Sequence, residues 1–273
     1  AEDIAKTLSI DVTRATAQHW GTEYGVLEMN VGVVDSLESA IDHIATLRNA
    51  RGEGRPSVLD AAKVCLENGA EGIVFHLRED RRHIKDFDVN QLKQSLNTFL
   101  DFEMGATNEM LKICADTKPN LSTLVPESRQ ELTTEGGLNM ERLFVDFQKR
   151  VVPSLNKAGV PISLFLDPNP VDIEYAKKLG VYAVELHTGT YALSSGKSKQ
   201  YELERLAEAA RIIHESGMKV NAGHGLDFEN IRDLIHYVPY LHDISIGHAI
   251  VADAVFRGLG NSVREMNSIV KNG

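Results

Sequence analysis

The sequence predicts one (β/α)8 barrel, a TIM barrel with extra helices, as a single domain spanning residues 1–273. Short runs rich in β-branched and aromatic residues alternate with helical patterns along the chain. Eight strand and helix units can be counted, and no second region of different character follows them. A doubly wound open sheet is the alternative, but no Gly-rich dinucleotide fingerprint follows the first predicted strand.

The elements follow in order along the chain. Residues 1–25 form an N-terminal extension that could be a helical arm, residues 26–31 the first strand, and residues 36–48 a helix or loop. Seven further strands are predicted at residues 73–75, 99–104, 121–125, 162–166, 183–186, 219–222 and 243–246. Helices are predicted at residues 58–68, 89–98, 108–117, 140–158, 171–179, 200–216, 228–237 and 249–270. Gly69, Gly159, Gly180 and Gly217 stand where four of these helices should end.

The composition indicates a protein that acts on small molecules. Hydrophobic residues make up 42% of the 273-residue chain, and no apolar run approaches membrane-spanning length. The net charge of −10 repels nucleic acid and anionic lipid, so we expect neither as a partner and expect any phosphate site to be a local basic pocket. Cys65 and Cys114 lack metal or redox spacing and no signal-peptide stretch opens the chain, so we expect buried thiols in a cytoplasmic protein.

The strand at residues 73–75 ends in a charged run. Seven of the eight residues from His76 to His83 are ionisable. In a barrel, the residues that follow each strand converge on the face where chemistry is found, and imidazole and guanidinium groups there handle anionic substrates. A solvated, charged surface is the plainer alternative.

Other predicted strand ends add acid and base groups. Glu103 should point into the barrel, where shielding from water raises a carboxyl pKa and suits it to acid/base work; the alternative is a structural carboxylate paired with an arginine. Asp167 is better explained as an N-terminal helix cap, and His187 could be either functional or structural. Residues 126–137 are long and polar for a barrel loop and could cover a bound substrate.

The last two predicted strands end in glycine and histidine. Gly223-His224-Gly225 and Gly247-His248 each should lead directly into a helix. Glycines let the backbone approach a ligand, and amides at a helix N-terminus favour an anion, so a phosphate site is expected here. No lysine stands at a strand's carboxyl end and no carboxylate or histidine cluster has metal spacing, which leaves acid/base catalysis on a phosphorylated compound.

Six blocks in this order resemble the pyridoxine 5'-phosphate synthase family: residues 41–52, 76–83, 131–137, 185–189, 221–226 and 246–250. The resemblance implies a barrel without metal or organic cofactor that forms a homo-octamer, a tetramer of dimers. It implies that 1-deoxy-D-xylulose 5-phosphate is joined to 3-amino-2-oxopropyl phosphate, giving pyridoxine 5'-phosphate with release of phosphate and water.

The resemblance also implies residue roles. It makes His76 a general base, Glu103 an acid/base that shuttles protons, and His224 a proton donor. The deoxyxylulose phosphate would be held by Asp42, His43, Arg78, His83 and Thr133, and the aminoketone phosphate by Arg51, Gly225, Gly247 and His248.

The chain departs from the family near its beginning. The family has Asn before Ile-Asp-His, whereas Ala40 stands there in this chain and Asn30 is the candidate to replace that Asn. This reading places about ten inserted residues, 32–41, between the first strand and Asp42. Two other functions stay open: a cofactor-free lyase or isomerase of one phosphosugar, and a barrel that only binds a phosphorylated vitamer. Three proton-transfer groups would be superfluous in a pure binder.

Overall fold

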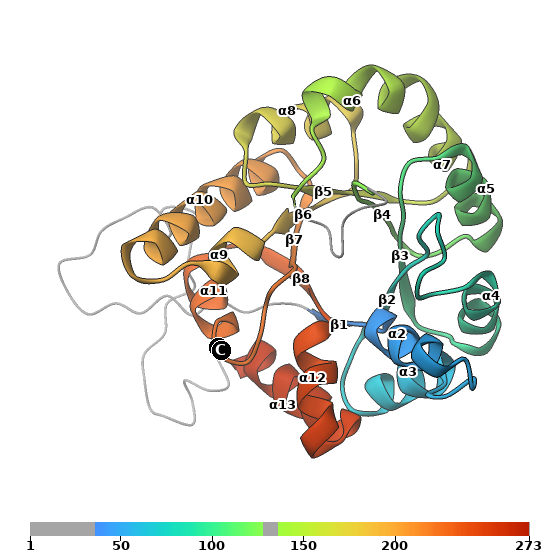
Figure 1. Ribbon diagram of the computed structural model, residues 1–273. Coiled ribbons are helices and arrows are strands. Elements are labelled where there is room, and N and C mark those ends of the chain that lie inside the picture. The colour runs from blue at the N-terminus through green and yellow to red at the C-terminus, as the bar shows by residue number, and fades with distance from the viewer. Residues whose placement is uncertain (1–35, 128–135, 273) are drawn as a thin grey trace.

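The computed structural model describes residues 36–127 and 136–272, which form a closed barrel of eight parallel strands ringed by helices (Figure 1). The strands are β1 (Ser36–Ala40), β2 (Gly72–His76), β3 (Phe99–Glu103), β4 (Ser122–Leu124), β5 (Ile162–Leu166), β6 (Ala183–His187), β7 (Lys219–Gly223) and β8 (Leu241–Ile246). They are ordered β3-β2-β1-β8-β7-β6-β5-β4. Bridges from Asp101 to Leu121 and from Met104 to Leu124 join β3 to β4 and close the barrel. The predicted fold is confirmed.

Helices cover the outside of the barrel in Figure 1. They are α2 (Asp42–Arg51), α3 (Val58–Glu67), α4 (Asp86–Ser95), α5 (Asn108–Thr117), α6 (Met140–Asp146), the π-helical η2 (Phe147–Val151), α7 (Val152–Ala158), α8 (Pro170–Leu179), α9 (Gly189–Leu193), α10 (Gly196–Glu215), α11 (Ile231–Tyr237), α12 (His248–Arg257) and α13 (Leu259–Asn272). No described helix is long and apolar enough to cross a lipid bilayer.

Alternation along the strands sorts side chains between two environments. On β3, Leu100 and Phe102 belong to the hydrophobic cluster that the helices complete, whereas Asp101 and Glu103 are buried outside that cluster. Asp101 accepts hydrogen bonds from the backbone and hydroxyl of Thr123 on β4, at 3.1 and 2.7 Å. On this strand, apolar side chains pack against the helices, whereas buried polar side chains alternate with them. Glu103, the last of these polar residues, stands at the carboxyl end of β3.

Local signals explain several element boundaries. Ser57 and Thr107 cap α3 and α5 by accepting hydrogen bonds from the backbone N–H groups of Asp60 and Met110. Gly159 ends α7 in the left-handed conformation, at a φ of 74°, which glycine adopts without steric cost. Both cysteines are free and buried, as predicted.

The first strand corrects the sequence-based prediction. Residues 26–31 lie outside the described part of the chain, and residues 36–40, expected as helix or loop, are β1. β1 pairs with β2 and with β8, so its conformation is set by two neighbours rather than by its own polar sequence. Since α2 begins at Asp42, the expected insertion between the first strand and Asp42 is wrong.

Three helix predictions also change. The single helix expected at 140–158 contains the π-helical turn η2, and the one expected at 249–270 is divided into α12 and α13 at Gly258, whose φ is 84°. Gly225 does not lead directly into a helix, because α11 begins only at Ile231. His248, in contrast, is the first residue of α12.

Candidate active site

His224 stands directly after β7 in an unusual backbone conformation. Its φ is 76°, in the left-handed region that non-glycine residues seldom occupy. Its ring packs on Phe165, with centroids 4.4 Å apart, and its Nδ1 lies 3.9 Å from Oε1 of Glu185 on β6. Burial, followed by the charges of His187, His76 and His43, lowers the pKa of His224 to about 3. His224 is therefore uncharged at neutral pH in the protein without substrate.

The backbone of His224 is held from the neighbouring strand end. The fully buried Thr188 hydroxyl lies 2.7 Å from the carbonyl oxygen of Gly223 and 2.6 Å from that of His224. The Thr188 amide also donates to the Gly223 carbonyl, at 3.0 Å. Farther along this loop, the side chain of Asn230 donates to the carbonyl of Gly225. Thr188, in the motif after β6, thus fixes the turn that presents His224.

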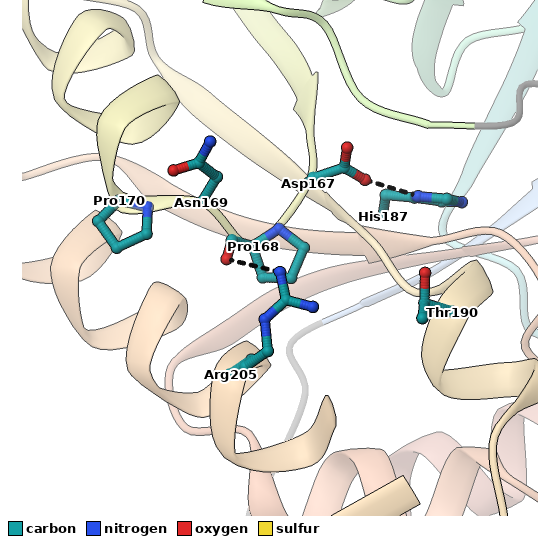
Figure 2. A pocket seen from close by; sticks show the side chains of 7 residues that line it. All are labelled: Asp167, Pro168, Asn169, Pro170, His187, Thr190 and Arg205. Atoms are coloured by element: carbon teal, nitrogen blue, oxygen red, sulfur yellow. Dashed lines mark hydrogen bonds and ion pairs between the residues drawn. The ribbon is translucent and has the colours of Figure 1, made fainter. Parts of the chain in front are cut away.

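A pocket of about 480 Å³ opens beside these residues, between the ends of β5 and β6 and helix α10 (Figure 2). Its lining includes Asp167, His187, Thr190 and Arg205. Asp167 Oδ1 lies 2.9 Å from His187 Nδ1, and the pKa of Asp167 is lowered by this hydrogen bond although burial opposes it. Asp167 is not the cap of α8, as the sequence suggested; Asn169 caps that helix. The structure places His187 6.0 Å from His224, ring centroid to ring centroid.

His43 on α2 meets His248 at the start of α12. Their ring centroids are 4.9 Å apart at an interplanar angle of 62°. Burial and then the neighbouring His248 lower the pKa of His43. Gly247 directly precedes α12 as its N-cap. This contact joins the residues expected around the deoxyxylulose phosphate to those expected around the aminoketone phosphate.

His76 and Glu103 end adjacent strands in register, β2 and β3. Both are buried, with 6% and 8% of their surface exposed. His76 Nδ1 lies 4.0 Å from Glu103 Oε2, so one small reacting group could contact both side chains. The structure therefore brings together the two groups that the sequence selected at separate strand ends.

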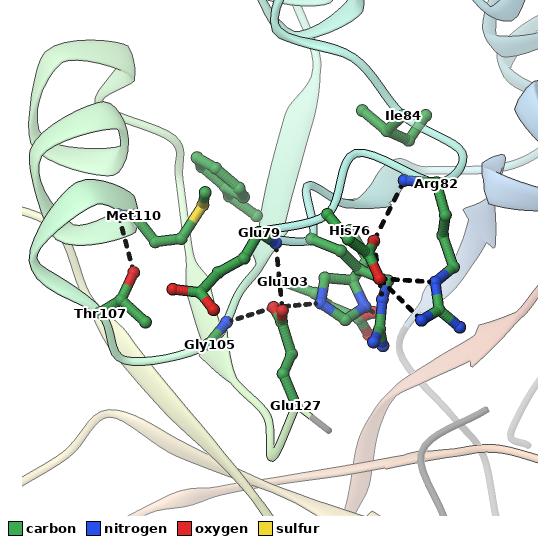
Figure 3. A network of polar contacts seen from close by, with 12 residues as sticks. His76, Glu79, Arg82, Ile84, Glu103, Gly105, Thr107, Met110 and Glu127 are labelled. Carbon is green, nitrogen blue, oxygen red and sulfur yellow. Dashed lines mark hydrogen bonds and ion pairs between the residues drawn. The ribbon is translucent and has the colours of Figure 1, made fainter. Parts of the chain in front are cut away.

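Glu127, which follows β4, is a member of this cluster that sequence reasoning did not select (Figure 3). Its Oε1 lies 2.8 Å from His76 Nε2 and accepts the Gly105 amide at 2.7 Å, while its Oε2 accepts the Glu79 amide at 3.1 Å. Burial would raise the pKa of Glu127, but the hydrogen bond and charge of His76 and the two amides lower it below its usual value. Its place three residues after the end of β4, at the carboxyl side of the barrel, was the available signal.

Asp42, His83 and Arg78 surround the same histidine. Asp42 Oδ1 accepts the His76 amide at 3.0 Å and lies 3.9 Å from His83 Nδ1. Burial raises the pKa of Asp42 to about 6, against the opposing effect of His76. Burial, with His76 and Arg78 next, lowers the pKa of His83 to about 3. Arg78 is only 4% exposed, and its Nε lies 3.4 Å from Asp80 Oδ1.

Three residues selected from the sequence are not placed. Asn30, Thr133 and the side chain of Arg51 lie outside the described part of the chain. Most of the expected substrate cover, residues 128–135, lies outside it as well. Within residues 36–127 and 136–272, no group of three or more histidine, cysteine or acidic side chains is arranged to hold a metal ion.

The geometry as a whole suits proton transfer beside an anion. Uncharged imidazoles, carboxylates and a buried guanidinium gather at the carboxyl ends of the strands, where the barrel shields them from water. Imidazoles and carboxylates exchange protons with carbon, nitrogen and oxygen, whereas guanidinium and amide donors hold phosphate.

Comparison with known proteins agrees with this geometry. Residues 37–272 match the model of the family described as pyridoxal phosphate biosynthesis protein PdxJ. Pyridoxine 5'-phosphate synthase of Chlorobium luteolum is 49% identical over 230 residues, covering 84% of this chain and 97% of that protein. The synthases of Salinibacter ruber and Anaplasma phagocytophilum are 47% and 43% identical, covering 85% and 84% of this chain and 96% and 97% of their own.

Solved structures support the fold alone. Mycobacterium tuberculosis tryptophan synthase aligns with a TM-score of 0.61 at 10% identity, covering 89% of this chain and 94% of that one. Thermus thermophilus phosphoribosyl anthranilate isomerase gives a TM-score of 0.53 at 13% identity, covering 86% and 98%. The chain belongs to the pyridoxal phosphate biosynthesis protein PdxJ family and is, with the pyridoxine 5'-phosphate synthases of that family, an enzyme of vitamin B6 biosynthesis.

Proposed function

We propose that this enzyme condenses 1-deoxy-D-xylulose 5-phosphate with 3-amino-2-oxopropyl phosphate and closes the pyridine ring of pyridoxine 5'-phosphate, releasing phosphate and water. The observation that carries the proposal is the gathering of His76, Glu103 and His224 at strand ends of a barrel whose relatives bear the synthase name. The reaction needs protons moved between carbon, nitrogen and oxygen at several steps, and these three groups can move them.

His76 and Glu103 are assigned the early steps. Amine addition to the ketone gives a carbinolamine, whose hydroxyl must be protonated to leave as water while the nitrogen loses a proton. His76 accepts a proton as general base, and Glu103, with Oε2 4.0 Å from the same imidazole, carries protons to the leaving oxygen. The same pair serves the enolisation that precedes loss of phosphate.

His224 is assigned proton donation on the opposite side of the site. Its low pKa means that it enters the reaction uncharged. A bound phosphate dianion near His224 and His43 would favour the protonated form of these two imidazoles. Substrate binding would therefore convert His224 itself into a proton donor.

The two substrates are assigned to two different sets of residues in the site. Asp42, His43, Arg78, His83 and Thr133 are proposed to hold the deoxyxylulose phosphate. Arg51, Gly225, Gly247 and His248 are proposed to hold the aminoketone phosphate, with Asn30 as a further candidate. The start of α12 supports the second assignment, because its ten residues begin at His248 and free amides there favour an anion. A cytoplasmic homo-octamer, a tetramer of dimers, belongs to the same proposal.

A chelator-treated, anaerobic assay with both substrates tests the function, following pyridoxine phosphate fluorescence and released phosphate. We expect both products from the unmodified protein, and we expect Glu103→Gln to lower kcat by about 10²-fold or more, as loss of a proton-transfer group does. Glu174→Gln, which removes an exposed carboxylate of α8, should leave kcat unchanged. Turnover of one phosphorylated compound without the aminoketone would contradict the proposal.

A further inference from the structure

We propose that Glu127 is the positioning residue for His76: it fixes the proton on Nε2 and leaves Nδ1, which faces Glu103, as the basic nitrogen. This inference rests on the proposed function for the identity of the reacting substrate, but the protonation pattern that it assigns belongs to the protein without substrate. Glu127 lies on the other side of the imidazole from Glu103, so His76 stands between two carboxylates (Figure 3).

The assignment of the proton follows from what each group can donate. Glu127 has a lowered pKa and is ionised near neutral pH, so both of its oxygens only accept hydrogen bonds. Its Oε1 lies 2.8 Å from His76 Nε2, which must therefore carry the proton in that contact. A neutral imidazole protonated on Nε2 has a free lone pair on Nδ1. That nitrogen points toward Glu103 Oε2, 4.0 Å away, where a reacting proton would be exchanged.

Glu127 is itself rigidly placed. Two backbone amides from different loops, those of Gly105 after β3 and Glu79 after β2, donate to its oxygens at 2.7 and 3.1 Å. Its side chain is 10% exposed, so water competes little for these contacts. Since His76 is also tied through its own amide to Asp42, both the ring and the backbone of the base are held.

An amide cannot replace this carboxylate. Three N–H groups converge on the two oxygens of Glu127, and a carboxylate accepts all three. In the Glu127→Gln variant, one of these oxygens becomes an NH2 group. In one orientation the NH2 group would face the Glu79 N–H, and in the other it would face both the Gly105 N–H and the His76 ring. In each orientation two hydrogen-bond donors face each other. Glu127→Gln therefore changes the hydrogen bonding while keeping nearly the same shape, which makes it a sharp test.

The protonation pattern can be measured without substrate. Protein labelled with 15N-histidine is compared as unmodified chain, Glu127→Gln, Glu127→Asp and the control Glu174→Gln, with the His76 signals assigned by their loss in His76→Gln. The unmodified protein and the control should show His76 protonated on Nε2 and unprotonated on Nδ1. Glu127→Gln should shift His76 toward a mixture of the two neutral forms, and Glu127→Asp should retain the Nε2 form.

Kinetics with both substrates complete the test. We expect Glu127→Gln to lower kcat by about 10²-fold with less than about threefold change in either KM, as misplacement of a catalytic base does, and Glu127→Asp to recover at least about tenfold of that loss. A proton on Nδ1 in the unmodified protein would overturn the inference, as would an unchanged kcat or an unchanged protonation pattern in Glu127→Gln. If that variant does not fold, the unmodified protein and Glu127→Asp decide the question. Absence of turnover in the unmodified protein would instead count against the proposed function, and the spectra would still test Glu127.

Discussion

Glu185 on β6 carries a strongly perturbed carboxyl group inside the barrel. It is 1% exposed, and neither of its oxygens has a hydrogen-bond partner among the described residues. Burial, and then the charges of Asp101 and Asp243, raises its pKa to about 8. A protonated carboxyl at neutral pH, 3.9 Å from His224 Nδ1, can donate a proton where an ionised one could not. Gly223 leaves room for it, since a Cβ at that position would lie 2.1 Å from Glu185 Oε1.

The pKa of Glu185 makes folding stability depend on pH. In the unfolded chain it ionises near its ordinary value of 4.5, whereas the folded protein keeps the proton up to about pH 8. The folded state thus binds more protons in this window, so Glu185 lowers the free energy of unfolding as pH rises from about 4.5 to 8. Glu185→Gln removes this titration. We expect the free energy of unfolding of the variant to lie within about 1 kcal/mol of that of the unmodified protein at pH 5 and to exceed it by about 4 kcal/mol at pH 8.

Thermal unfolding of the two proteins at pH 5, 6.5 and 8 measures this difference, which corresponds to several degrees in Tm. Glu174→Gln on α8 serves as the control, because its carboxylate is exposed and pairs only across one helical turn. A Tm difference between Glu185→Gln and the unmodified protein that did not change with pH would contradict the assigned pKa of Glu185.

At the scale of elements, the ends of β6 and β7 work as one unit. The left-handed backbone of His224 costs roughly 1 kcal/mol or more, and the Thr188 hydroxyl between the Gly223 and His224 carbonyls offsets part of that cost. This explains why a threonine follows His187: the side chain of one strand end orients the catalytic candidate of the next.

Removing that hydroxyl should affect both stability and turnover. Thr188→Val keeps the shape and leaves the Gly223 carbonyl bonded to the Thr188 amide, but it deprives the partly buried His224 carbonyl oxygen of its donor, which costs about 1 kcal/mol or more. We expect urea-induced unfolding to show a free energy of unfolding that is lower by the same amount. We also expect kcat to fall at least about tenfold, since His224 loses its orientation. Thr188→Ser, which keeps the hydroxyl, should preserve most of both. A valine variant as stable and as active as the threonine protein would show that this contact does not hold His224.

Sequence predicted the elements well where local signals decide them. Seven strands were placed within two residues of their observed ends, because their apolar runs are bounded by turns. β1 was missed because Ser36–Ala40 is polar and is held in the sheet by two partners. The division at Gly258 was missed because the apolar pattern continues on both sides of it. The strand conformation of β1 and the break at Gly258 depend on pairing and packing with distant segments, which the local sequence does not reveal.

At the scale of the whole molecule, the barrel brings residues that are far apart in the sequence close together at the ends of its strands. His76, Glu103 and His224 could be selected as strand-end residues, and the resemblance to a family named their roles; the structure adds their arrangement. The place of Glu127 after β4 was the signal that the sequence offered for it, but its contacts with His76 on β2 and with the Gly105 amide after β3 join distant segments and could not be predicted from spacing. The Asp167 interpretation was wrong for the same reason: a partner on β6, His187, competes with the nearby helix end.

The clustered histidines predict how the molecule responds to an anion. Burial lowers the pKa values of His43, His83 and His224, the last two to about 3, so these imidazoles are uncharged at neutral pH in the protein without substrate. A phosphate bound among them favours their protonated forms, and binding therefore takes up protons. The bound anion raises the pKa values of these histidines, so they take up protons when phosphate binds. By linkage, the affinity for phosphate must therefore rise as the pH falls.

We therefore expect inorganic phosphate to raise the Tm of this protein more at pH 6 than at pH 8, although the dianion itself is less abundant at the lower pH. The fold-change in apparent Kd from thermal shift should approach about tenfold per pH unit for each proton taken up. Sulfate, which does not titrate in this range, separates protonation of the protein from protonation of the ligand and should show the same direction. His43→Asn should weaken the pH dependence, because it removes one of the imidazoles whose pKa is lowered by burial and would be raised by the bound anion. Tighter binding of both anions at pH 8 than at pH 6 would mean that the histidine cluster does not carry the phosphate.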